Sequence, residues 1–146
     1  MNETIQSKIK ALRKNSRFAY IGSVNDEGFP QIKCMFAIKD DNVRVHYFST
    51  NTSSKRVRQY LQNPKASVYY CDNRFFKGAL FTGSMEALED SETKERFWNK
   101  GDEKYYPKGV EEPDYCVLKF TADTVNYYQG LNNTTFSIEE LEHGVL

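Results

Sequence analysis

The chain of 146 residues lacks any apolar run approaching the roughly 18 residues that a membrane-spanning helix needs. It also lacks net charge, because 20 Lys and Arg residues are balanced by 20 Asp and Glu residues. A nucleic-acid-binding protein that depends on an overall positive field is therefore disfavoured. We expect neither a membrane nor a nucleic acid as partner.

Cysteine is scarce: Cys34, Cys71 and Cys116 form no C-x-x-C pair and no cluster with His at the spacing of metal ligands. Each cysteine lies in a strand-like apolar run, so we expect reduced thiols in or near the core and no metal site. The odd number of cysteines and the lack of an N-terminal apolar segment predict a cytoplasmic protein.

Length and aromatic content favour an ordinary globular protein. We expect a single domain over residues 1–146, a size that buries roughly 68–70% of the unfolded surface. Ten Tyr and ten Phe residues argue against disorder and favour β-strands or pockets for planar ligands.

Hydrophobic periodicity predicts mostly strands, with a few helices at the margins. We expect helices over residues 3–14, 53–62 and from 90 to about 98, and strands over residues 17–24, 31–38, 43–49, 65–72, 79–87 and 115–128. Residues 101–113 are expected to be irregular, and the polar tail from residue 132 to be partly mobile. Short meandering strands with too few helices for a doubly wound sheet predict a mainly β fold, a six-stranded antiparallel β-barrel.

The stretch from His46 to Arg56 is the clearest candidate binding site. A strand runs into a turn made of hydroxyl and amide side chains, and the next helix begins with Lys55 and Arg56. Hydroxyls, free backbone N–H groups at a helix N-terminus and two cations suit a phosphate, although the pattern of a Walker loop is absent. The alternative is a Ser or Thr N-cap followed by solvated basic side chains.

No residue qualifies as a catalytic acid, base or nucleophile. His46 has no Ser, Cys or carboxylate at a spacing that suggests a triad, and no pair of carboxylates suggests glycosidase chemistry. Catalytic residues are therefore left unassigned.

Three sequence segments, in their order along the chain, point to a known family. The first is a strand, the turn Gly28-Phe29-Pro30 and a second strand, and the next covers residues 45–56. The third combines Phe97-Trp98, residues 105–109 and residues 113–115. Together they resemble the pyridoxamine 5'-phosphate oxidase-like family of FMN-binding split barrels, and the subgroup of general stress protein 26 within it.

The resemblance implies a homodimer that holds FMN in two clefts at its interface. By position, it implies that Lys33 faces the phosphate or ribityl chain and that the segment from Phe48 to Thr50 lines the flavin edge. It also implies that Ser54 and Lys55 hold the phosphate. The residues that the resemblance assigns to the cofactor are Lys33, Phe48, Ser49, Thr50, Asn51, Ser54, Lys55 and Trp98. Two of these have a structural alternative, since Lys33 could be an outward-facing strand lysine and Trp98 a lid on the core.

One departure from the family limits the activity. True pyridoxamine phosphate oxidases carry a C-terminal Arg-x-His segment for the substrate phosphate, whereas residues 137–146 contain no Arg. The resemblance therefore implies an FMN-dependent oxidoreductase that passes electrons from a reduced nicotinamide to a small organic acceptor other than a vitamin B6 phosphate. The alternative is a non-enzymatic protein that stores or senses flavin, or binds haem through His46 or a cysteine.

Overall fold

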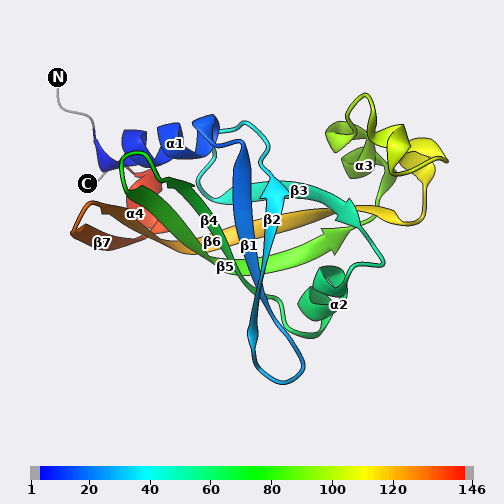
Figure 1. Ribbon diagram of the computed structural model, residues 1–146, viewed down its shortest axis with the longest axis horizontal. Coiled ribbons are helices and arrows are strands. Elements are labelled where there is room, and N and C mark those ends of the chain that lie inside the picture. Colours follow the sequence, from blue (N-terminus) through cyan, green and yellow to red (C-terminus); the bar gives the residue numbers. More distant parts are fainter. Residues whose placement is uncertain (1–3, 144–146) are drawn as a thin grey trace.

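Alternating apolar and polar side chains build seven antiparallel strands in the computed structural model, which describes residues 4–143 (Figure 1). Their order in the sheet is β2-β1-β4-β5-β6-β3, and β7 pairs with β6. The strands are β1 Phe18–Val24, β2 Pro30–Phe36, β3 Val45–Asn51, β4 Lys65–Asp72, β5 Lys77–Leu88, β6 Tyr115–Gln129 and β7 Asn132–Ser137. The predicted antiparallel β fold is confirmed, with one strand more than the six expected.

Helices lie at the margins of the sheet, and α3 is at the opposite end from α4 and β7 (Figure 1). The helices are α1 Ile5–Asn15, α2 Lys55–Gln62, α3 Ser91–Phe97 and α4 Ile138–Glu142, with short 3-10 turns at η1 Asp102–Lys104 and η2 Gly109–Glu111. Each α-helix begins after a Thr, Ser or Asp whose side chain accepts a hydrogen bond from a backbone N–H of the first turn. No helix among the described residues is long and apolar enough to cross a membrane.

One row of paired side chains forms the centre of the core. Ile21, Val68, Phe81, Val125 and Phe136 lie opposite one another on five neighbouring strands, and all five are buried. Side chains that are paired in register share one face of a sheet, so this row defines the inner face. The period-two pattern of the sequence therefore corresponds to real burial.

The barrel is open on one side. β2 and β3 are the two end strands of the order, and within residues 4–143 no ladder pairing joins them. β5 bends through a register shift at Gly83, where a Cβ atom would lie 2.0 Å from the carbonyl oxygen of Thr121. Only glycine fits so close to the backbone of β6, so this position requires it.

The expectation of a partly mobile tail from residue 132 is wrong for its described part, and residues 144–146 lie outside the described residues. Residues 132–142 form β7 and α4, and Phe136, Ile138 and Leu141 are buried. These apolar side chains are separated by polar ones, so the tail has a polar average composition although it contains buried residues. Gly130, with a φ of 60°, makes the turn that folds β7 back onto β6.

A buried polar network fastens α1 to the sheet. The Nε of Arg13 donates a hydrogen bond to the hydroxyl of Tyr70 at 3.3 Å, and its guanidinium also donates to the carbonyl oxygen of Asn42. The same Tyr70 hydroxyl lies 2.8 Å from Nδ1 of His46, whose Nε2 lies 3.1 Å from the carbonyl oxygen of Val43. Burial, aided by the positive charge of Arg13, lowers the pKa of His46 to about 3, so this imidazole is neutral and structural.

Candidate functional site

The candidate anion site lies where β3 passes into α2. Ser54 is the N-cap of α2, and its hydroxyl accepts a hydrogen bond from the backbone N–H of Val57 at 3.3 Å. The backbone N–H groups of Lys55 and Arg56 have no acceptor among the described residues. The N-terminus of this helix therefore offers free N–H donors and the positive end of the helix dipole.

Arg56 adds a cation to this helix start. Its Nη2 donates a hydrogen bond to the Oγ1 of Thr50 at 2.9 Å, while its Nε is buried without any hydrogen-bond partner in the described part of the chain. A buried donor without a partner costs about 1–3 kcal/mol, so an unpaired guanidinium nitrogen indicates a missing acceptor. An anion bound at the start of α2 would supply that acceptor.

Sequence reasoning did not include Arg56 among the cofactor residues. Arg56 belongs to the same basic helix start as Lys55, the residue that the resemblance assigns to the cofactor. Lys55 is exposed, whereas Arg56 is half-buried against Thr50. In the sequence, the pair of adjacent basic residues indicates that a cation is present at the helix start. It does not show which of the two side chains turns inward.

The turn before α2 is held by a residue far along the chain. Asp114, just before β6, accepts hydrogen bonds from the backbone N–H of Ser53 at 2.8 Å and from its hydroxyl at 3.1 Å. The backbone N–H of Thr52 also donates to the carbonyl oxygen of Asp114 at 2.7 Å. These bonds fix the shape of the turn and use up the donors of Ser53.

Lys33 lies on the inner face of the end strand β2. It pairs in register with Ile21, which is buried, yet the side chain of Lys33 is itself exposed. On the same face, Gln31 pairs with Ser23, whose hydroxyl donates to the side chain of Gln59 in α2 at 2.5 Å. The register thus places Lys33 on the side of the sheet where α2 docks, at the open side of the barrel.

The remaining β3 residues of the predicted set have different surroundings. The side chain of Phe48 is buried in the core, so only its backbone could face a ligand. The hydroxyl of Ser49 is half-buried and lies 3.5 Å from both the carbonyl oxygen of Phe97 and the hydroxyl of Tyr115. Asn51 donates a hydrogen bond to the hydroxyl of Ser53 at 3.1 Å.

Trp98 packs within an aromatic cluster of its own chain. Its ring centroid lies 5.2 Å from that of Tyr115 and 6.1 Å from that of Tyr106, and the residue is the C-cap of α3. The carbonyl oxygen of the preceding Phe97 lies near Ser49, so this cluster borders β3. Trp98 thereby covers the end of the core close to the candidate site.

A cavity of about 310 Å³ lies beside Ser49, between the end of β2 and the segment after α3. It occupies the open side of the barrel, where the two end strands are not paired. Its lining residues are Cys34, Met35, Phe36, Ala37, Ile38, Ser49, Asn99, Asp102, Tyr105 and Tyr106. The cavity therefore borders β3, the strand that carries half of the predicted cofactor residues.

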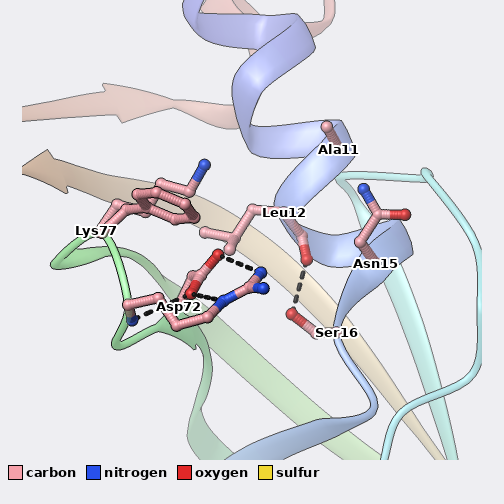
Figure 2. Close-up of a pocket in the computed structure, with 8 residues that line it drawn as sticks. Ala11, Leu12, Asn15, Ser16, Asp72 and Lys77 are labelled. Atoms are coloured by element: carbon pink, nitrogen blue, oxygen red, sulfur yellow. Dashed lines mark hydrogen bonds and ion pairs between the residues drawn. The ribbon is translucent and has the colours of Figure 1, made fainter.

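A second cavity, of about 280 Å³, lies between α1 and the turn from β4 to β5 (Figure 2). Asp72 accepts two hydrogen bonds from the guanidinium of Arg74, both at 3.1 Å, and this pairing lowers the pKa of Asp72. The hydroxyl of Ser16 donates to the carbonyl oxygen of Leu12 at 2.6 Å. These polar groups satisfy one another, so the cavity calls for no ligand.

The three thiols are free, and their burial differs from the prediction in one case. Cys116 is buried and Cys71 half-buried, as expected for core or near-core residues, but Cys34 is exposed. Cys34 lies on the end strand β2, which has no neighbour on one side to cover it. No group of three His, Cys, Asp or Glu side chains placed to hold a metal ion occurs within residues 4–143.

Comparison with known proteins gives the family. Residues 5–129 match the profile of the pyridoxamine 5'-phosphate oxidase family. The chain belongs to this family. A protein from Clostridium acetobutylicum related to general stress protein 26 of Bacillus subtilis has a similar structure, with 37% sequence identity and a TM-score of 0.86 over 97% of this chain and 99% of that one. The predicted family is thus confirmed.

More distant solved structures share the fold. One is a pyridoxamine 5'-phosphate oxidase-related, FMN-binding protein from Nostoc punctiforme, with a TM-score of 0.65, 15% identity and coverage of 92% of this chain and 91% of that one. Another is a haem-binding protein from Mycobacterium smegmatis, with a TM-score of 0.74, 13% identity and coverage of 98% and 62%. A search among proteins of curated function gives no match.

Proposed function

We propose that this protein is an FMN-binding flavoprotein that passes electrons from a reduced nicotinamide to a small organic acceptor. The observation that carries the proposal is the buried, unpartnered Nε of Arg56 beside Thr50 at the start of α2. The FMN-binding relative from Nostoc punctiforme, which shares the fold, supports the choice of cofactor. FMN, when bound, supplies two-electron redox chemistry.

The donor set suits a phosphate dianion. Arg56 offers a charged N–H, and the first turn of α2 offers the N–H groups of Lys55 and Arg56. We propose that Lys33 adds an ammonium group from the end strand β2. Each charge-assisted hydrogen bond to such an anion contributes about 1.5–3 kcal/mol. Ser54 orients the helix start by capping it, and its hydroxyl would lie close to a phosphate bound there.

The planar ring would lie along β3, toward the cavity beside Ser49. The hydroxyl of Ser49 and the backbone of Phe48 and Thr50 would line its edge, and Trp98 would cover the same end of the barrel. Our proposal assigns no residue as general acid or base, because hydride transfer needs no obligatory proton transfer from a side chain.

Pyridoxamine phosphate is not the proposed substrate. Residues 137–143 contain no Arg, and α4 presents the exposed carboxylates of Glu139 and Glu140. The described C-terminal segment therefore offers no guanidinium to a substrate phosphate, the group that the Arg-x-His segment supplies in true pyridoxamine phosphate oxidases. The acceptor is therefore expected to be a small organic molecule without a phosphate. We further propose that the reaction takes place in the cytoplasm, where free thiols such as these three persist.

We propose that the protein works as a homodimer with a flavin at each of two interface clefts. The face of β1 and β2 opposite the core exposes several apolar side chains: Phe18, Tyr20, Ile32 and Phe36. Ile32 and Phe36 share this face of β2 and are 77% and 71% exposed, which is unusual for large apolar side chains on an end strand. A second copy of the chain, related by a two-fold axis, would bury this face.

Haem binding is the weaker alternative because the chain's buried histidine is already engaged. Both ring nitrogens of His46 have partners within the core, and the residue is fully buried. It could bind iron only after the network with Tyr70 and Arg13 was broken. The haem-binding relative shares the fold at only 13% identity, so its ligand cannot be assigned to this chain by similarity.

The test is the visible absorption spectrum of the purified protein, followed by release of the chromophore and its chromatography against FMN, FAD and riboflavin. We expect a yellow protein that yields FMN and oxidises reduced nicotinamide when an acceptor is added. A colourless protein that fails to take up added FMN would overturn the proposal. A Soret band would show haem in its place.

A further inference from the structure

The cavity beside Ser49 has a distinctive charge pattern. Asp102 is its only charged lining residue, and no Lys, Arg or His side chain lines it. The Oδ2 of Asp102 accepts a hydrogen bond from the backbone N–H of Asn99 at 2.8 Å, whereas Oδ1 has no hydrogen-bond partner among the described residues. The cavity therefore repels anions and offers one carboxylate oxygen to a cation or an N–H donor.

The walls of the same cavity are apolar and aromatic. Tyr105 is 75% exposed, and its ring packs against no other aromatic ring within residues 4–143. Phe36 and Ile38 form part of the wall on the β2 side. A free aromatic ring at the mouth of a cavity is suited to stacking on a planar ligand, and more strongly if that ligand is cationic.

The cavity also borders the strand that leads to the anion site. Ser49, which lines it, precedes Thr50, the partner of Arg56, on β3, and the two side chains lie on opposite faces of that strand. A ligand in the cavity would therefore lie next to the strand along which the flavin ring is proposed to bind. The anion site would hold the phosphate of the flavin, and the cavity would hold the acceptor.

We propose that this cavity is the acceptor site and that it selects a planar aromatic acceptor that is cationic or uncharged, with Asp102 as the specificity-determining residue. This inference rests on the function proposed above. A planar phenothiazinium cation illustrates the balance of the reaction. Reduced nicotinamide loses a hydride from its C–H bond, and the acceptor gains those two electrons and that proton as a new N–H bond on its ring nitrogen, becoming neutral.

Direct dye binding tests the inference without turnover. Equilibrium dialysis of the purified protein compares methylene blue, a planar cation, with anthraquinone-2-sulfonate, a planar anion of similar size. We expect the cation to bind at least about tenfold more tightly, because the unpaired carboxylate oxygen of Asp102 attracts the cation and repels the anion at contact distance. Equal affinity for the two dyes would overturn the proposal.

Two variants locate the effect. We expect Asp102→Asn to weaken methylene blue binding roughly tenfold and Tyr105→Ala to weaken binding of both dyes. Folding should be unaltered, because Asn keeps a side-chain oxygen for the backbone N–H of Asn99 and Tyr105 is 75% exposed. Glu103→Gln is the matched control, since it removes the same charge from the neighbouring residue, which does not line the cavity. An effect of Glu103→Gln as large as that of Asp102→Asn would overturn the role of Asp102.

FMN content separates this inference from the proposed function. We expect Asp102→Asn and Tyr105→Ala to retain as much FMN as the unmodified protein. If both variants lose FMN, the cavity holds the flavin and the acceptor role is overturned. If the unmodified protein binds no FMN, the proposed function fails and the acceptor role with it, whereas bound FMN with dye affinities unchanged by either variant overturns only the inference.

Discussion

Arg56 and Thr50 are joined across the turn between β3 and α2 by a hydrogen bond of 2.9 Å from the guanidinium Nη2 to the threonine Oγ1. The bond holds the guanidinium against the end of β3, and it leaves the buried Nε of Arg56 without a partner in the described residues. A side chain fixed in place with an unsatisfied charged donor is preorganised to bind an anion. The proposed phosphate site depends on this pair.

Arg56→Gln should weaken FMN binding by roughly 10- to 100-fold, because it removes one charge-assisted hydrogen bond of about 1.5–3 kcal/mol. Arg58→Gln is the matched control, since Arg58 is an exposed arginine on the same helix. Fluorescence titration of FMN into the FMN-free protein gives both dissociation constants. Equal effects of the two substitutions would show that general charge, rather than the Arg56 site, governs affinity.

Lys33→Ala combined with Lys55→Ala should lower FMN affinity while the melting temperature stays within about 2 °C of the unmodified protein. Both side chains are exposed, so their removal leaves no cavity and no unpaired buried group. The two single variants divide the effect, and we expect Lys33 to contribute more because it lies on the inner face of β2. A double variant with full FMN occupancy would contradict the phosphate assignment.

Phe36→Glu should convert the proposed dimer to a monomer and reduce its retention of FMN. The substitution places a charge beside Phe18 on the exposed apolar face of β1 and β2, where burial of an unpaired charge is costly. Leu131→Glu is the control, because Leu131 is 99% exposed at the turn between β6 and β7. Sedimentation velocity and FMN content are measured together, and a monomeric unmodified protein that still holds one FMN per chain would refute the interface cleft.

The stability of the protein should fall as the pH drops below about 6.5. The pKa of His46 is lowered from 6.5 to about 3 in the folded protein, so between these values the unfolded chain binds a proton that the folded chain does not. This residue should contribute a loss of up to about 1.4 kcal/mol per pH unit over that window.

Urea unfolding at pH 7.5, 6 and 5 measures this loss, with NMR of the His46 imidazole as the control for its protonation state. We expect the ring to stay neutral at pH 5 in the folded protein. An imidazole that titrates near pH 6.5 while the protein remains folded would mean that the network with Tyr70 and Arg13 is open to water.

The strands and main helices could be predicted from local patterns, and most of them were. Alternation of apolar residues located β1 to β6 within a few residues, and the Ser-rich turn before two basic residues located the start of α2. The tail was mispredicted because its three buried apolar residues are spaced too widely to dominate the local average. Cys34 was predicted near the core, but its place on an end strand left it exposed.

The sequence by itself determined the family, the antiparallel β fold and the segment that carries the candidate anion site, because these follow from local periodicity and from the order of short motifs. Only the tertiary structure decided which of Lys55 and Arg56 turns inward, on which face Lys33 lies, and that Asp102 and Tyr105 meet the end of β2 at one cavity. The inward turn of Arg56 is a side-chain contact with Thr50, and the face of Lys33 follows from strand register. The cavity joins segments far apart in the chain, and no local pattern in a single sequence records any of these relationships.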